Sequence, residues 1–373
     1  MMPMSGLNPV RILVRGVNWL GDAVMTTPAL LRLRERFPKS RITMMAAEKL
    51  GDLWTQHPAL DVTLIVTPDD NLWSVARRLK QERFDLALIL PNSPRSALEP
   101  MLARVPVRIG YGRGWRRMLL TQAIPARPDH VRMRKRSVAE IRGLLSSNIA
   151  PIAVPPSAHQ LHDYLGLVAA LGASSQVIAP RLHVTEEEVA KARGEILPAL
   201  KAVGIQRPLF FGLNPGAEYG PAKRWPVENF MAVARRVARE FPEVIWLVFG
   251  GKADANACAR VADPLGNRAI NLAGATSLRQ LMCLLRLCRL VFTNDTGPMH
   301  LAAALGTLVI VPFGSTSPEL TGPGLPGDPR HHLLRSPTPC APCFLRSCPI
   351  DFRCMTGITV EQVVGAVSQV AKA

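Results

Sequence analysis

Three short polar segments of this 373-residue chain carry residue types that can do chemistry. Asp22 follows an apolar run, and a carboxylate in such a place can act as a general base. Lys223 and Arg224 stand in a loop with two glycines and three prolines, where backbone can approach a ligand closely and cations can bind phosphate. Asp295 stands at the edge of the turn in the third segment and can accept hydrogen bonds from sugar hydroxyls.

The third segment, residues 290–306, reads as a strand, a tight turn and a helix. Pro298 suits the first helical position and Gly306 suits the position just past the helix end. The positive end of the helix dipole would then face a phosphate, through the backbone amides of Thr296, Gly297 and Met299. The alternative is a structural cap, because Asp and Thr before a helix are commonly simple N-caps.

The loop around Asp22 is open to two interpretations. Its glycines, Gly16 and Gly21, do not form the G-x-G-x-x-G pattern of a dinucleotide site. Ligands of an open parallel sheet bind beyond the carboxyl ends of its strands, which is where Asp22 falls. The residue is therefore either a base at the edge of a cleft or a cap of the helix that begins near Ala23.

The elements that carry these residues alternate between strands and helices, which predicts an α/β fold with parallel sheets. Strands are expected at residues 11–15, 41–46, 62–66, 84–90, 107–111, 209–213, 244–249, 269–272, 290–292 and 308–311, with helices at 23–37, 72–81, 96–103, 161–171 and 186–200. The pattern repeats after residues 174–208, so we expect two similar halves with a cleft between them. We place the N-terminal domain at residues 1–178 and the C-terminal domain at 179–373, with a last helix that packs back on the first domain.

The most basic region lies between residues 110 and 142 and contains Arg113, Arg116, Arg134 and Arg136. It is either a solvated face or a site for an acceptor with phosphate or carboxylate groups, which arginine binds well. The whole chain carries a formal charge of +17, which implies an acidic partner. With only three tyrosines there are few rings for bases to stack on, so nucleic acid is the weaker candidate partner.

Composition also indicates the cellular compartment of the protein. Residues 1–10 lack the basic start and apolar core of a signal peptide, and no apolar run is long enough to span a bilayer. Seven unevenly spaced cysteines suit a reducing cytoplasm better than a disulfide framework. We therefore expect a cytoplasmic protein whose contact with a membrane is peripheral.

Three of these segments together resemble the ADP-heptose:lipopolysaccharide heptosyltransferases. They are Gly-x-Asn-Trp-Leu-Gly-Asp-Ala at 16–23 with Thr-Thr-Pro-Ala-Leu at 26–30, the loop at 214–226, and Asn-Asp-Thr-Gly-Pro-Met-His-Leu-Ala-Ala at 294–303. The second loop is most similar to heptosyltransferase II, and the resemblance runs from residue 11 to about residue 360. It implies a GT-B fold, in which two Rossmann-like domains with parallel sheets face a central cleft.

The resemblance also implies an activity and its residues. The enzyme would move L-glycero-D-manno-heptose from ADP-heptose to the first heptose of the lipopolysaccharide inner core, with inversion. Asp22 would be the catalytic base, and Asn18, Arg113, Arg134 and Arg136 would bind the acceptor at the inner face of the anionic inner membrane. The donor would be held by Asn214, Gly216, Lys223, Arg224, Gly250, Asp295, Thr296, Gly297 and His300. No Asp-x-Asp motif follows a strand, so we expect protein groups, without a metal, to neutralise the diphosphate.

A cysteine-rich stretch does not fit this picture directly. Its spacing, Cys340, Cys343, Cys348 and Cys354, could ligate zinc or a cluster. The second pair is not the CxxC of a zinc ribbon, and similar tails occur in this family without an established catalytic metal. We therefore expect no cofactor and no structural zinc at these residues.

Three alternatives stay open at this point. A related heptosyltransferase would act on a different core acceptor, and the acceptor hydroxyl cannot be derived from these residues. A GT-B nucleotide-sugar epimerase would share the diphosphate site but would not need the basic region. A basic nucleic-acid-binding protein would explain the charge, but neither the proline-stiffened loop around Lys223 nor Asp22 at a strand end.

Overall fold

The computed structural model describes residues 6–147, 154–201, 205 and 207–372 and divides into two compact units. The first unit comprises residues 1–130 and 157–183, and the second comprises residues 131–156 and 184–373. The expected boundary after residue 178 falls near residue 183, where the chain passes from the first unit to the second for the last time. The expectation that residues 131–156 belong to the first domain is wrong. Residues 1–5 of the segment tested for a signal peptide lie outside the described residues.

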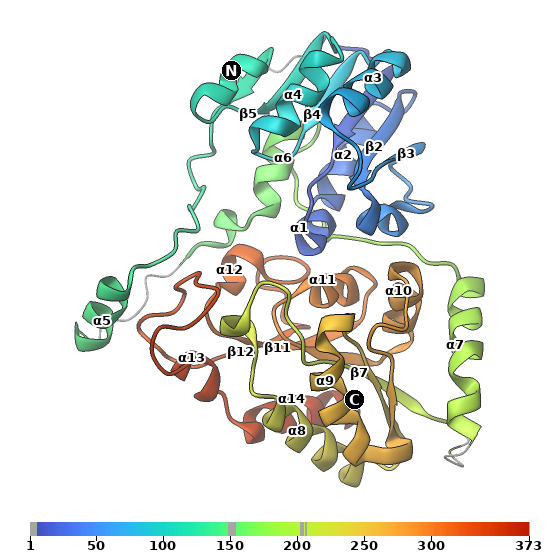
Figure 1. Ribbon diagram of the computed structural model, residues 1–373, viewed down its shortest axis with the longest axis vertical. Coiled ribbons are helices and arrows are strands. Elements are labelled where there is room, and N and C mark those ends of the chain that lie inside the picture. Colours follow the sequence, from blue (N-terminus) through green and yellow to red (C-terminus); the bar gives the residue numbers. More distant parts are fainter. Residues whose placement is uncertain (1–5, 148–153, 202–204, 206, 373) are drawn as a thin grey trace. The chain divides into compact units, whose positions relative to one another are not determined.

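The sheet of the first unit is fully parallel, with the strand order β3-β2-β1-β4-β5-β6 (Figure 1). The central strands β1 and β4 are almost wholly buried, as expected for short apolar runs with helices on both faces. The strands are β1 (Arg11–Arg15), β2 (Arg41–Ala47), β3 (Val62–Val66), β4 (Leu86–Ile89), β5 (Val107–Tyr111) and β6 (Gln122–Ile124).

Helices of the first unit pack in two pairs, α2 against α6 and α3 against α4. They are α1 (Leu20–Met25), α2 (Thr27–Arg36), α3 (Leu72–Glu82), α4 (Pro94–Leu102) and α6 (Leu161–Ala169), with short 3₁₀ turns at Glu48–Trp54, Gly114–Leu119 and Pro156–Ala158. The single helix expected over residues 23–37 is in fact two. Pro28 has no N–H to continue the ladder, and the Thr27 hydroxyl instead bonds to the Val24 carbonyl at 2.8 Å.

The second unit repeats the arrangement, with the parallel strand order β12-β11-β10-β7-β8-β9 (Figure 1). Counted from its own first strand, this is the same order as in the first sheet. The strands are β7 (Leu209–Asn214), β8 (Val244–Val248), β9 (Ala269–Asn271), β10 (Leu290–Thr293), β11 (Leu308–Phe313) and β12 (His332–Arg335). In both sheets the order reverses between two central strands, which is the usual place for ligands of such folds.

Helices α8 (Val227–Glu240), α9 (Ala255–Ala262) and α14 (Val360–Lys372) contribute to one apolar core with the second sheet. Helices α7 (Glu186–Lys201) and α11 (Gly297–Ala304) both pack against α10 (Leu278–Leu287). The remaining helices are α5 (Val138–Ser147), α12 (Pro318–Thr321) and α13 (Arg353–Thr356), with 3₁₀ turns at Pro221–Lys223, Lys252–Asp254 and Asp263–Arg268. The last helix packs on α8 and contacts β11 and β12 of the second unit. Its expected return to the first domain stays a prediction.

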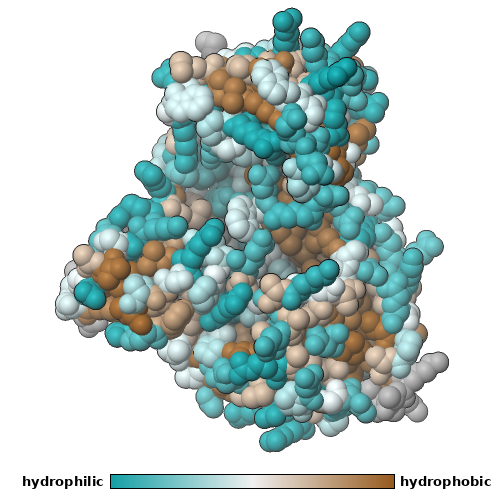
Figure 2. Space-filling model, in the orientation of Figure 1, coloured by the Kyte–Doolittle hydropathy of each residue, from teal (hydrophilic) through white to brown (hydrophobic). Residues whose placement is uncertain are grey.

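Helix α5 explains why residues 131–156 group with the second unit. Its Ile141 is buried against Cys340 and Cys343, about 200 residues further along the chain. Among the described residues, no helix has the length and apolar character that a bilayer crossing requires. Figure 2 shows hydrophilic side chains over much of the visible face of each unit, with apolar side chains in smaller patches.

Candidate active site

Asp22 lies inside helix α1, at the carboxyl end of the central strand β1. The N-cap of that helix is Trp19, and no side chain caps it, so the interpretation of Asp22 as a simple cap is wrong. The Asp22 carboxylate accepts a hydrogen bond from the side-chain amide of Gln160 at 3.3 Å. A half-buried carboxylate at the point where the strand order reverses is well placed to receive a proton.

Gln160 is held in turn by Tyr164, whose hydroxyl oxygen accepts from the same amide nitrogen at 2.9 Å. Burial first, and the nearby charge of Asp22 second, raise the pKa of Tyr164 well above its ordinary value. The phenol of Tyr164 therefore stays protonated. Sequence reasoning missed Gln160, because nothing in the local pattern connects it to a loop about 140 residues earlier.

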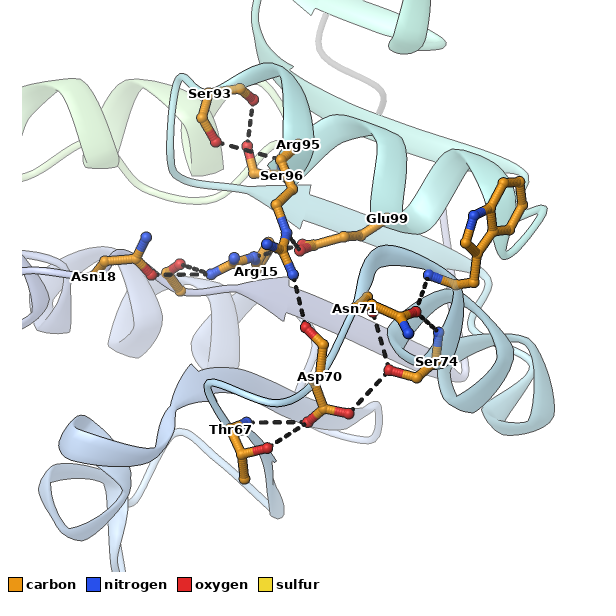
Figure 3. A network of polar contacts seen from close by, with 12 residues as sticks. Arg15, Asn18, Thr67, Asp70, Asn71, Ser74, Ser93, Arg95, Ser96 and Glu99 are labelled. Carbon is orange, nitrogen blue, oxygen red and sulfur yellow. Dashed lines mark hydrogen bonds and ion pairs between the residues drawn. The ribbon is translucent and has the colours of Figure 1, made fainter.

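Asn18, expected to bind the acceptor, is exposed and is positioned by a buried ion pair. The guanidinium of Arg15 donates to the Gly16 carbonyl at 2.7 Å and to the Asn18 side chain at 3.4 Å. Its Nε atom also donates to Glu99 at 2.8 Å, and Glu99 is fully buried on α4. Figure 3 shows Arg15 lying between Asn18 and Glu99, with Arg95 on the other oxygen of that carboxylate at 3.3 Å.

The network in Figure 3 continues from Arg95 to the turn before α3. Arg95 donates to the Asp70 carbonyl at 3.0 Å, and the Asp70 carboxylate accepts from the Thr67 amide at 3.0 Å. That backbone hydrogen bond is the main cause of the lowered pKa of Asp70. The loop after β1 is thus tied to the loop after β3 through charged side chains that sequence reasoning did not connect.

The arginines expected to bind the acceptor have local partners. Arg113, in the first unit, lies 2.9 Å from the Nε2 atom of His130. Arg134 and Arg136 belong to the second unit, where Arg134 binds Glu140 and Arg136 donates to the Pro339 carbonyl. Arg116 is buried and donates to backbone carbonyls of Pro91 and Ser93, so its role is structural. The acceptor roles of Arg113, Arg134 and Arg136 stay predictions.

Two loops of the second unit, after β7 and after β10, are joined by the fully buried Asn294. Its side chain accepts from the Trp225 amide at 3.0 Å and donates to the Pro215 carbonyl at 2.8 Å. Asn214, at the end of β7, donates to the Thr293 hydroxyl at 3.0 Å. The two segments singled out in the sequence are therefore parts of one rigid structure, and Asn294 is the residue that sequence reasoning passed over.

Lys223 and Asp295 form a largely buried ion pair at 2.7 Å. The same Asp295 oxygen accepts a hydrogen bond from the Thr316 hydroxyl at 2.5 Å. The Lys223 ammonium also lies 5.0 Å from the centre of the Tyr219 ring, a cation–π contact. Both charges are thus fixed in place beside the start of α11.

Beside this pair lies a pocket of about 480 Å³, within the size range of small-molecule sites. Five of the residues expected to bind the donor line it, namely Asn214, Gly216, Arg224, Gly250 and Thr296. Its far wall carries Asp254, which accepts from the Gly251 amide at 3.2 Å and lies 3.6 Å from the Arg224 guanidinium. Arg224 and Lys252 thus bring positive charge to a nucleotide-sized hollow, and Glu218 and Asp254 bring negative charge.

Helix α11 begins at Gly297, so Pro298 is its second residue and not the expected first. Gly306 lies just past the helix end, as predicted, and its φ is +87°. The Met299 amide donates to the Thr296 carbonyl at 3.1 Å, so the expectation that it faces a ligand is wrong. His300 is buried on α11 and does not line the pocket. The roles of Gly297 and His300 stay predictions.

Comparison with known proteins matches most of the chain. The model of glycosyltransferase family 9 (heptosyltransferase) matches residues 72–352. The lipopolysaccharide heptosyltransferase 2 of Salmonella typhimurium is 29% identical, over 84% of this chain and 85% of that protein. The lipooligosaccharide heptosyltransferase 2 of Haemophilus ducreyi is 30% identical, over 84% and 86%.

A solved structure of the ADP-heptose lipopolysaccharide heptosyltransferase II of E. coli has the same fold. The two share 24% identity with a TM-score of 0.74, over 97% of this chain and 100% of that one. The expected fold class, GT-B with two Rossmann-like domains, is confirmed.

Proposed function

This chain belongs to glycosyltransferase family 9, the heptosyltransferases, and from that premise we propose that it moves L-glycero-D-manno-heptose from ADP-heptose to the first heptose of the lipopolysaccharide inner core. Membership of an enzyme family excludes the non-catalytic nucleic-acid-binding alternative, and it favours group transfer over epimerisation. The observation that carries the proposal is the pocket of about 480 Å³ at the start of α11, lined by Arg224 and Thr296, which are the sequence neighbours of the ion-paired Lys223 and Asp295.

The donor would lie in this pocket with its diphosphate toward the start of α11. Lys223, Arg224 and the Thr296 and Gly297 amides would neutralise the charge that grows on the diphosphate as the sugar leaves. Such electrostatic stabilisation by groups already in place commonly lowers the barrier more than any other effect does. Asp295 would orient the heptose, and its bond to Lys223 would hold the ammonium in position.

The transfer itself needs one base and inverts the anomeric centre. Asp22 would take the proton from the acceptor hydroxyl, whose oxygen then attacks the anomeric carbon opposite the diphosphate. The bond from that carbon to the diphosphate oxygen breaks with its electron pair, and ADP departs. Gln160 supports this role because it fixes one Asp22 oxygen.

The acceptor would bind through Asn18, Arg113, Arg134 and Arg136. An inner core rich in phosphate and keto-acid groups suits a chain with a formal charge of +17. The same charge supports a peripheral location at the cytoplasmic, anionic face of the inner membrane.

The deciding experiment is incubation with ADP-heptose and a truncated lipopolysaccharide that carries one heptose. We expect the acceptor to gain the mass of one heptosyl unit while ADP is released. We expect Asp22→Ala to abolish transfer and to leave ADP-heptose binding, measured by calorimetry, unchanged. Gain of a heptose only on a core without any heptose would point to a different acceptor, and full activity of Asp22→Ala would contradict the base assignment.

A further inference from the structure

Four of the seven cysteines line one small cavity in the second unit. The cavity has a volume of about 10 Å³, roughly the space of one water-sized particle, and none of its lining residues is charged. The cysteines that line it are Cys340, Cys343, Cys348 and Cys354. Three of these thiols are buried and Cys348 is half-buried, and apart from Ser315 the other lining residues are apolar.

A buried hydroxyl also lines this cavity without a partner. The Oγ atom of Ser315 is one of the few buried polar atoms of the described residues that make no hydrogen bond. A buried hydroxyl without a partner is unfavourable, and a metal-bound thiolate in the cavity could accept its hydrogen bond.

The backbone around the cavity already directs N–H groups at sulfur. The Phe352 amide donates to the Cys348 thiol at 3.3 Å, and the Leu345 amide bonds to the Cys343 thiol. The turns that make this possible place two bulky residues, Phe344 and Phe352, at a φ of +56°. Amide donors to sulfur stabilise the thiolate form that metals require.

Two arginines bring positive charge close to the cluster. Arg136 interacts electrostatically with Cys343, and Arg353 does so with Cys340. This gives Arg136 an electrostatic role beside the cavity that was not foreseen from the sequence.

We propose that these four cysteines bind one soft transition-metal ion, zinc or iron(II), as a tetrathiolate. This proposal departs from the expectation of no metal, which rested on the cysteine spacing and on similar tails in the family. Among the described residues, no three acidic, histidine or cysteine side chains already stand in an ion-binding arrangement. Binding therefore requires the thiols to turn about their single side-chain torsions until each sulfur lies about 2.3 Å from the ion.

The metal would brace the proposed donor site, a consequence that rests on the proposed function. The Ala222 amide donates to the Arg346 carbonyl at 2.9 Å, and the Tyr219 hydroxyl donates to the Phe344 carbonyl at 2.9 Å. The cysteine-rich segment thus carries the loop that presents Lys223. The Phe344 amide also donates to the Ser315 carbonyl at 2.7 Å, next to the residue that binds Asp295.

The first test is elemental analysis of the purified full chain. We expect about one zinc or iron per chain in the wild type and in the control Cys283→Ser, whose thiol lies on α10 outside the cavity. We expect most of the metal to be lost in Cys343→Ser and in Cys348→Ser. The second variant changes a half-buried thiol and keeps the test valid if Cys343→Ser does not fold.

Cobalt(II) provides a readout that does not depend on activity. Metal-depleted protein refilled with cobalt should show sulfur-to-metal charge-transfer absorption, which Cys348→Ser should weaken and Cys283→Ser should preserve. Absence of bound metal in the wild type together with absence of this absorption would overturn the proposal. If metal binds but its removal leaves ADP-heptose affinity unchanged, the bracing role is wrong, and neither result bears on whether transfer occurs.

Discussion

The ammonium of Lys223 lies 2.7 Å from the Asp295 carboxylate, and both side chains are largely buried. Removing one partner leaves the other charge buried and uncompensated. We expect Lys223→Met and Asp295→Asn each to lower the free energy of unfolding by about 3–5 kcal/mol, and the double variant to cost less than their sum. Urea unfolding of the four proteins measures this, and strict additivity would show that the pair is not coupled.

Substitution of Lys223 should also change the affinity for ADP-heptose, which can be measured separately from stability. Loss of a charge-assisted contact with phosphate should weaken ADP-heptose binding by about 10- to 100-fold in Lys223→Met and in the double variant. Calorimetry on folded protein checks this, and unchanged affinity would remove Lys223 from the phosphate site.

Gly216 offers a matched test of the pocket. A Cβ atom on Gly216 would lie 2.4 Å from the Asp254 carboxyl carbon, whereas one on Gly251 would come no closer than 3.7 Å to that side chain. Asp254 cannot move without losing its bonds to Gly251 and Arg224. We expect Gly216→Ala to weaken ADP-heptose binding about tenfold and Gly251→Ala to bind almost as the wild type does. Equal affinities would mean that the donor does not use this wall of the pocket.

Glu99 and Arg95 provide a comparison of buried and exposed charge in the first unit. Glu99→Gln leaves the buried Arg15 without a carboxylate, and should cost about 3 kcal/mol of unfolding free energy. Arg95→Gln removes the exposed partner of the same carboxylate, and should cost under about 1 kcal/mol. Denaturant titrations of both variants test the difference, which would vanish if Arg15 were solvated.

Because His57 is buried, we can predict how acid changes the stability of the fold. Burial first, and the charge of His183 second, lower the pKa of His57 to about 4, against 6.5 for a free histidine. The unfolded chain therefore binds the proton first, so stability present above pH 6.5 is lost as the pH falls toward 4. We expect the wild type to lose about 2 kcal/mol more than His57→Phe between pH 7 and pH 5. Equal losses in the two proteins would contradict the lowered pKa.

The local sequence pattern predicted most strands, because apolar runs bounded by polar residues form strands in the structure. It missed β6 and β12, which are short strands at the sheet edges. It also missed the grouping of residues 131–156 with the second unit, because Ile141 packs on cysteines far along the chain.

In the candidate site, too, residues could be predicted from local sequence, whereas their partners from distant elements could not. Polar residues that follow strands, such as Asp22 in the first turn of α1 and Asp295 after β10, could be found from the sequence because their position after an apolar run is a local property. The residues that hold them, Gln160 and Thr316, come from other elements and had no local signal. Five predicted donor residues do line one pocket, which the regular strand-to-loop pattern made foreseeable.

The position of α5 has a consequence for synthesis on the ribosome. Ile141 leaves the ribosome roughly 200 residues before Cys340 and Cys343, the residues it packs against. At about 5–20 residues per second, the apolar side of α5 would wait on the order of 10–40 s for its partners. During that interval the first sheet is already complete, so the nascent chain carries a finished sheet and an exposed helix that nothing yet covers. Chaperone contact with the growing polypeptide should therefore concentrate on residues 138–147.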